Sequence, residues 1–334
     1  MRPRLFKRSL LFLLLLCTIA LGLLIHDWNQ YWAQEKDFIQ HDIEIKAGES
    51  GQEVINKLIA VGLLNNKPLY IKLWLRFGVD NQQFKQGYYR FEGPYLQKQI
   101  LDQLLQGKVH YFQLTIIPGW SYRQAIELIH SNPYLVQDIP VHLKQDESST
   151  LQNEEGWFFP DTYLFTYHSK ASELLKRGKT LMQKKLEEVW SKRQPNDFIE
   201  TPSQLLTLAS IVEKETAIKQ EKKHIAGGFL NRLKKKMRLQ TDPTVIYGMG
   251  AEFDGNLRRK DLTKDTDYNT YTRFGLPPTP IALPDLESLE SVANPQQTSD
   301  LYFVADGRGG HVFSETLEQH NSNVRKFILN KSYH

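Results

Sequence analysis

The most apolar part of the chain lies close to its N-terminus. Residues 9–25 (SLLFLLLLCTIALGLLI) carry no charge, and at a helical rise of about 1.5 Å per residue they cover about 25 Å, the short end of what spans a bilayer. The basic residues before this run are Arg2, Arg4, Lys7 and Arg8, and the aromatic residues after it are Trp28, Tyr31 and Trp32. Basic flanks stay on the cytoplasmic side and aromatic residues favour the membrane interface. We therefore predict a cytoplasmic tail (1–8) and a single transmembrane helix (9–26) in the cell inner (cytoplasmic) membrane, with the C-terminal part periplasmic.

A cleaved signal peptide is the alternative for this segment. Ala20 and Gly22 would be the small residues near its cleavage point. This fits less well, because residues 23–25 (LLI) continue the apolar run past them. In both cases the rest of the chain is exported. The only cysteine, Cys17, lies inside the run, so the exported part has no thiol for disulfides, Cys-zinc sites or catalysis.

Two segments share a strand-to-helix pattern. IEIKAGESGQEVINKL (43–58) aligns without gaps with LTIIPGWSYRQAIELI (114–129). In each, a β-rich run leads to a glycine, and a capping box then begins a helix. The boxes pair Ser50 with Glu53 and Ser121 with Gln124. Coincidence of a common signature remains open, so the match serves only to mark two β–α starts.

The pattern beyond these starts predicts an α+β fold with two units. A helical pattern over 66–77, a strand-like GYYRF (87–91) and a helical pattern over 96–105 give a small βααβ module at 41–110. The remainder, 111–334, has a long charged helix (171–190) and mixed α/β character. Polar, proline-containing stretches at 131–155 and 191–202 predict loops. GLPPTPIALP (275–284) has too much proline for a helix or central strand, so it predicts an ordered turn or groove wall.

Charge and composition narrow the function classes. The chain has 42 Lys and Arg against 38 Asp and Glu, a net charge of +4 that the four N-terminal basic residues supply. The rest is balanced, and no RNP, helix-turn-helix or zinc-finger pattern is present, so we expect no nucleic-acid partner. G-x-S-x-G, S-x-x-K and H-E-x-x-H are all absent, and GAEFDGN lacks the Lys-Ser/Thr of a phosphate loop. Carboxylate chemistry remains, with no metal and no cofactor expected.

The candidate acid lies on a helix with strong start signals. In residues 201–219, Thr201 is an N-cap, Pro202 follows it, and Gln204 completes a capping box. The apolar face is formed by Leu205, Leu208, Ala209 and Val212. Lys214 points away from that face, while Glu213 and Glu215 lie at its two edges.

Burial among apolar groups raises the pKa of a carboxyl, as a general acid working near neutrality requires. Three bulky apolar side chains surround Glu215, so the periodicity slightly favours it over Glu213. Solvated helix charges are the alternative for both.

Three long motifs carry a resemblance to a known family. EKETAIKQEKKHIAGGFLNRLKKKMRLQTDPTVIYGMG, YNTYTRFGLPPTPIALP and LYFVADGRGGHVFS occur in this order, and together with GWFFPDTYLF they resemble the YceG-like family of endolytic murein transglycosylases. The resemblance covers nearly the whole exported chain. It implies a LysM-like module at 41–110 and a catalytic transglycosylase domain at 111–334. The family's essential residue is the second Glu of E-K-E-T, which is Glu215 here.

The resemblance also implies a reaction and its partners. The enzyme would be a lyase that cleaves MurNAc–GlcNAc bonds within nascent glycan strands, leaves 1,6-anhydroMurNAc ends and so limits strand length. One carboxyl suffices, because the muramic acid C6 hydroxyl is the nucleophile. Expected partners are peptidoglycan glycan strands, the cytoplasmic membrane, and cell-wall synthases and penicillin-binding proteins.

Polar and aromatic residues after the acid suit a glycan groove. The resemblance favours substrate-binding roles for Gln240, Asp242, Tyr247, Asn269 and Tyr271. Asp242 is the best second group beside Glu215, although an Asp-Pro turn starter is equally consistent. His311 is a further candidate within a GRGGH turn. The basic cluster at 231–238 (NRLKKKMR) could face peptide carboxylates or acidic lipid, but a solvated helix end is favoured.

Two other functions remain open. A two-carboxylate hydrolase would use Glu215 with Asp242 and leave reducing ends. A non-catalytic peptidoglycan-binding scaffold would not need Glu215 at all, and would depend instead on residues 41–110.

Overall fold

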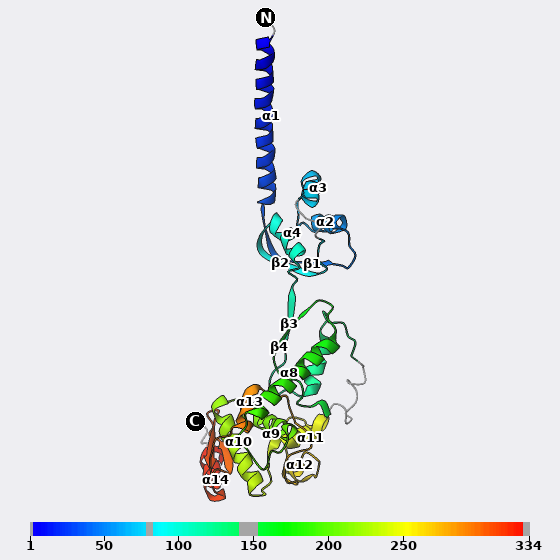
Figure 1. Ribbon diagram of the computed structural model, residues 1–334. Helices are drawn as coiled ribbons and strands as arrows, with labels where there is room; N and C mark the ends of the chain where they lie inside the picture. The colour runs from blue at the N-terminus through cyan, green and yellow to red at the C-terminus, as the bar shows by residue number, and fades with distance from the viewer. Residues whose placement is uncertain (1–2, 78–82, 140–152, 330–334) are drawn as a thin grey trace. The chain divides into compact units, whose positions relative to one another are not determined.

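The structure is a computed structural model that describes residues 3–77, 83–139 and 153–329, with side chains from Arg8 onward (Figure 1). The chain divides into two compact units, Met1–Phe112 and Gln113–His334. Both mix helices and strands, so the predicted α+β class is confirmed. Most of the basic tail, and most of the loop predicted at 131–155, lie outside the described side chains or residues.

Unit 1 contains the apolar N-terminal helix and a two-stranded sheet. Its elements in chain order are α1 (Pro3–Trp32), β1 (Glu35–Ile45), α2 (Gly51–Ala60), α3 (Pro68–Phe77), β2 (Gly87–Leu96) and α4 (Gln97–Gln106). β1 and β2 pair antiparallel from Glu35–Leu96 to Ile45–Gly87, with an irregularity between Phe38 and His41. The order β-α-α-β is the one that the pattern predicted, although the sheet begins several residues before 41.

The core of unit 1 includes the end of α1. Tyr31 and Trp32 are buried there with Trp74 of α3, Tyr89 and Phe91 of β2, and the apolar faces of α2 and α4. Tyr31 and Trp32 were predicted, together with Trp28, to lie at a membrane interface. In the structure they bury large apolar surfaces against the rest of unit 1. One helix thus joins the apolar run to the folded unit.

α1 is long and apolar enough to cross a membrane. The stretch Arg8–Trp32 has the required length and apolar composition, and its apolar 18-residue segment is not buried within the structure. Cys17 is exposed on it. This is consistent with single-pass membrane anchoring.

Unit 2 consists mainly of helices. Its elements are β3 (Tyr111–Thr115, which begins in unit 1), α5 (Tyr122–Ser131), β4 (Thr162–Thr166), α8 (Ala171–Ser191), α9 (Pro202–Glu215), α10 (Lys219–Lys234), α11 (Asp242–Met249), the 3₁₀ turn η1 (Gly250–Glu252), α12 (Arg259–Thr263), α13 (Leu286–Ala293), β5 (Tyr302–Ala305), β6 (His311–Ser314), α14 (Leu317–Val324) and the π-helical turn η2 (Arg325–Leu329). β3 pairs with β4, and β5 with β6. α9 is the centre of the core: every residue from Leu205 to Val212 is buried.

The predicted capping boxes are confirmed. In α2, α5 and α9 the cap hydroxyl of Ser50, Ser121 or Thr201 accepts from the third helical N–H, and the Glu or Gln at that position accepts from the cap N–H. Gly48 and Gly119 both have φ near +80°, a region that favours glycine, which explains the glycine in each β–α start. Residues 275–284 form neither helix nor strand, as predicted.

Candidate active site

Glu215 is the last residue of α9, and its side chain lines a cavity at the end of this helix. The cavity has a volume of about 350 Å³. Its lining comes from six parts of unit 2: Glu215 (α9), Arg232 (α10), residues 239–241 before α11 with Asp242, Tyr271, Tyr302 and Phe303 (β5), and Leu317 and His320 (α14). A carboxyl group therefore meets hydroxyl, amide and aromatic groups, the types that contact sugars.

The surroundings of Glu215 favour its protonated form. Burial raises its pKa, and the negative charge of Asp242 acts in the same direction. The Thr241 hydroxyl donates to Glu215 Oε1, and the positive charges of His311 and Arg232 counter part of the rise. The net result is a pKa above the usual range of a glutamate, as a general acid needs.

Arg232 is a fixed positive charge beside this acid. Its Nε donates to Leu301 O and its Nη1 to Leu239 O, each at 2.6 Å. It is buried, and burial lowers its pKa. The basic cluster at 231–238 is therefore not simply a solvated helix end: its first two residues bond to carbonyls, since Asn231 Nδ2 donates to Thr298 O at 2.7 Å.

Asp242 begins α11, followed by Pro243 in the first turn, and its side chain is held from outside that helix. Tyr271 Oη donates to Asp242 Oδ1 at 2.6 Å. Burial and this carboxylate raise the pKa of Tyr271, so its hydroxyl remains a donor. Asp242 thus begins a helix with Pro243 and also lines the cavity that contains Glu215.

The predicted substrate-binding residues separate into two groups. Gln240, Asp242 and Tyr271 line the cavity with Glu215. Tyr247 lies on α11 outside this lining and donates from Oη to Glu155 Oε2 at 3.2 Å. Asn269 is buried and its Nδ2 donates to three backbone carbonyls, of Asp261, Leu262 and Lys264.

His311 lies near the acid without lining the cavity. Its Nδ1 is 2.8 Å from Glu221 Oε2, and its backbone N–H donates to Glu221 Oε1 at 2.9 Å. The Thr216 hydroxyl, directly after Glu215, also reaches Glu221 Oε2 at 3.4 Å. This arrangement gives His311 a fixed position from which its charge acts on Glu215.

Sequence reasoning missed Glu155 altogether. Its carboxyl is buried, with the residue only 3% exposed, and accepts from Tyr122 N at 2.8 Å and Gly156 N at 3.3 Å as well as from Tyr247. Burial raises its pKa to about 7. Its burial had no local signal, because two of its three partners, Tyr122 and Tyr247, come from distant parts of the sequence.

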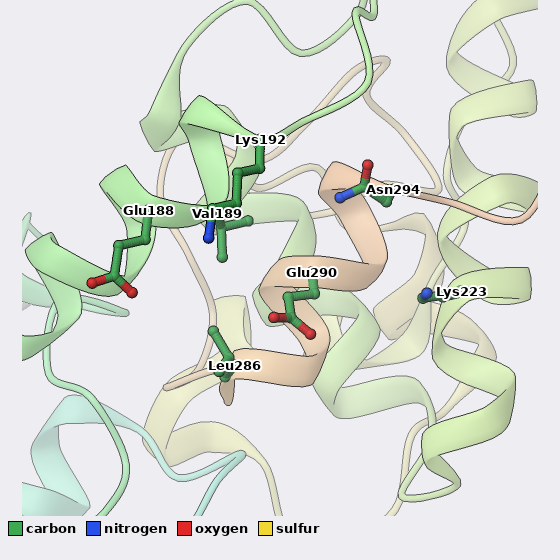
Figure 2. A pocket seen from close by; sticks show the side chains of 7 residues that line it. All are labelled: Glu188, Val189, Lys192, Lys223, Leu286, Glu290 and Asn294. Carbon is green, nitrogen blue, oxygen red and sulfur yellow. The ribbon is translucent and has the colours of Figure 1, made fainter.

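A second hollow in unit 2 has different properties. It has a volume of about 270 Å³ between α8, α10 and α13 (Figure 2). Figure 2 shows its two carboxylates, Glu188 and Glu290, on separate helices, with Lys192 and Lys223 around them. All four are exposed, so water solvates their charges. This hollow lacks a partly buried carboxyl like that of Glu215 in the first. In the described ranges 3–77, 83–139 and 153–329, no group of three or more His, Cys, Asp or Glu could hold a metal ion.

A comparison with models of protein families identifies the family of this chain. The model of the YceG-like family matches residues 43–326. The chain belongs to the YceG-like family. The predicted family membership is thus confirmed over both units.

Relatives within this family include named enzymes. The chain is 32% identical over 275 residues to the endolytic murein transglycosylase of Bacillus subtilis strain 168, covering 75% of this chain and 74% of that protein. It is 33% identical over 204 residues to the endolytic murein transglycosylase of Streptococcus pneumoniae D39, covering 60% of this chain but only 36% of that longer protein. A crystal structure of a YceG-like protein from Listeria monocytogenes aligns with a TM-score of 0.53 and 29% identity, over 85% of this chain and 98% of that one.

Proposed function

We propose that this protein is an endolytic peptidoglycan lytic transglycosylase, a lyase in which Glu215 acts as both acid and base. The observation that carries the proposal is a partly buried carboxyl with a raised pKa in a cavity of sugar-binding residue types. Membership of the YceG-like family and the names of its relatives support it.

The reaction needs one proton donor that becomes a base. Glu215 gives its proton to the glycosidic oxygen as the bond from MurNAc C1 to that oxygen breaks. The C6 hydroxyl of the same MurNAc forms the new bond to C1, and its proton passes to the Glu215 carboxylate. The product has a 1,6-anhydro end and no water is consumed. Glu215 regains its proton within the cycle.

The neighbours of Glu215 fit the two halves of this cycle. The charge of Asp242 keeps the proton on Glu215 before reaction and favours the positive charge that develops at C1. Arg232 favours the carboxylate that exists between the two proton transfers. Gln240 and Tyr271 provide polar groups for sugar hydroxyl and N-acetyl groups. Tyr247 and Asn269 support the site from behind, by holding α11 and the segment that leads to Tyr271.

The deciding test replaces the acid. Glu215→Gln keeps the shape of the side chain but removes the proton, so release of anhydro-ended muropeptides from purified sacculi falls about 100-fold or more. Glu290→Gln, an exposed carboxylate of the second hollow, is the matched control and keeps full activity. Full activity of Glu215→Gln with a normal circular dichroism spectrum contradicts the proposal and turns attention to Glu213 or to a scaffold function.

Hydrolysis is the second candidate, because Asp242 places another carboxylate in the same cavity. A hydrolase would activate water with it and leave reducing ends. Mass spectrometry separates the two reactions, since an anhydro end is one water lighter than a reducing end. Reducing ends that disappear in Asp242→Asn would establish the hydrolase.

The cellular setting is part of the proposal. α1 is a single-pass anchor with its basic N-terminus in the cytoplasm, and the part of unit 1 that follows α1 lies with unit 2 on the outer side of the cytoplasmic membrane. This keeps Glu215 close to nascent strands, where cleavage limits strand length and cell-wall synthases and penicillin-binding proteins are the expected partners. The predicted LysM-like character of residues 41–110 would add a glycan contact to unit 1.

A further inference from the structure

Helix α3 in unit 1 exposes an apolar stripe. Leu69, Leu73 and Phe77 follow each other at intervals of four residues, so they share one face of the helix. Leu69 is 65% exposed and Phe77 is 76% exposed. An apolar groove of about 530 Å³ runs between this face and the end of α1. It is lined by Leu24, Ile25, Trp28, Leu69, Tyr70, Leu73, Trp74 and Phe77.

Polar and aromatic contacts fix α3 against α1. The carboxylate of Asp27 lies 2.9 Å from Lys67 Nζ and accepts from Tyr70 Oη. Trp32 and Trp74 have ring centroids 5.7 Å apart. The stripe is therefore held beside Leu24 and Ile25, the last residues of the charge-free run.

We propose that α3 is an interfacial helix, whose stripe enters the bilayer leaflet from which α1 emerges. The groove between the two helices holds lipid acyl chain. This inference rests on the membrane anchoring proposed for α1 and goes beyond the cleavage reaction. It gives unit 1 a second attachment to the membrane surface.

Continuity with the membrane helix identifies the occupant as lipid. Leu24 and Ile25 are exposed on α1 and line the groove as well, so a bilayer that surrounds them also reaches the stripe. The other exposed residues of α3 include Lys72 and Arg76, and the helix has no acidic residue. An apolar face beside basic residues suits an anionic membrane surface, and Trp28 and Tyr70 suit its interfacial region.

Site-specific fluorescence in vesicles tests this inference with the full chain. Cys17 is the only cysteine, so Cys17→Ser allows one probe to be placed by Phe77→Cys, or by Leu73→Cys if the first variant does not fold. The matched control is Ile39→Cys, because Ile39 is 98% exposed on β1 outside the stripe. Each protein carries an environment-sensitive fluorophore in vesicles of phosphatidylethanolamine and phosphatidylglycerol, with or without nitroxide-labelled acyl chains.

The expected result is that nitroxide lipids remove most of the fluorescence at position 77 and leave that at position 39. Equal quenching by nitroxide lipids at positions 77 and 39 overturns the inference. A blue-shifted probe at 77 that nitroxide lipids do not quench also overturns it, because a protein surface or a second copy then covers the groove. A probe on native Cys17 separates the causes: if Cys17 is quenched and 77 is not, the anchor stands and the interfacial helix fails. If Cys17 is not quenched, the anchor fails and this inference fails with it, while the activity of Glu215 remains a separate matter.

Discussion

Two carboxyl groups on α9, two residues apart, have different surroundings. Glu213 Oε2 accepts from Lys222 Nζ at 3.0 Å and from Ser288 Oγ at 2.6 Å, in a buried network that ties α9 to α10 and α13. Glu215 bonds to Thr241 and lines the cavity. The first carboxyl is held in the folded core, because removing Lys222 would take the cation from a buried carboxylate. The second has no ion-pair partner among the described residues and lines the cavity, as the proposed proton transfer requires.

The hydroxyl of Thr241 tunes the acid. Its hydrogen bond favours the carboxylate and so lowers the pKa of Glu215 against the effect of burial. In Thr241→Val that pKa rises, and the high-pH limb of the activity profile moves up by about one pH unit, since one unit equals about 1.4 kcal/mol. Release of anhydro ends measured across pH gives the limb. Thr263→Val, an exposed threonine on α12, leaves the limb in place, and a shift to lower pH in Thr241→Val would refute this role.

Glu155 makes the stability of unit 2 depend on pH. Burial raises its pKa from 4.5 to about 7, so the folded state holds a proton that the unfolded chain releases. The proton on Glu155 stabilises the folded state fully below pH 4.5. As the pH rises to 7, the folded state loses about 3 kcal/mol of this stabilisation. Relative to Glu155→Gln, the wild-type free energy of unfolding therefore falls over that interval. Urea unfolding across pH measures both proteins, and parallel curves would show that Glu155 titrates normally.

At the scale of elements, α10 packs closely against the chain before β5. A Cβ at Gly227 would overlap the carbonyl oxygen of Gln296, whereas at Gly228 the nearest such atom is 3.7 Å away. Gln296 N also donates to Lys223 O at 3.0 Å, so this backbone cannot easily withdraw. The two adjacent glycines thus have different reasons to be present.

Alanine at these two positions should act in opposite directions. Gly227→Ala lowers the free energy of unfolding by about 1–3 kcal/mol, because backbone must move. Gly228→Ala raises it by up to about 1 kcal/mol through helix propensity. Thermal unfolding of the pair measures the difference, with each variant serving as the control of the other. Equal effects would mean that the close approach at Gly227 does not constrain the helix.

Short-range sequence patterns predicted where helices begin. They could not predict contacts between residues that are far apart in the sequence. Ser50 and Thr201 each meet their partner three residues away, so the sequence alone predicts those caps. The partners of Glu155 lie 33 and 92 residues away in Tyr122 and Tyr247. Helical periodicity could place Glu215 at the edge of an apolar face, but only the fold brings Thr241 to it.

At the scale of the whole molecule, the apolar N-terminal run and the core of unit 1 share one helix, α1. The sequence predicted a membrane helix at 9–26 and a module from 41, with aromatic residues between them at the interface. A tryptophan that suits an interface also suits a core, so composition alone could not distinguish the two. The structure places Tyr31 and Trp32 in the core of unit 1, and Asp27 against Lys67 and Tyr70.

Because the end of α1 belongs to the core of unit 1, the chain can be shortened from its N-terminus only as far as these residues without unfolding unit 1. A chain that begins at Asp27 keeps the aromatic contacts and the Asp27 bonds, so unit 1 stays folded. A chain that begins at Ala33 loses two buried aromatic side chains, each of which contributes about 3 kcal/mol or more to such a core. Hydrogen exchange followed by mass spectrometry should show rapid exchange in peptides of β1 and β2 only in the shorter chain. Peptides of α9 are the internal control, because unit 2 has its own core. Equal protection of β1 and β2 in both chains would mean that unit 1 folds without the end of α1.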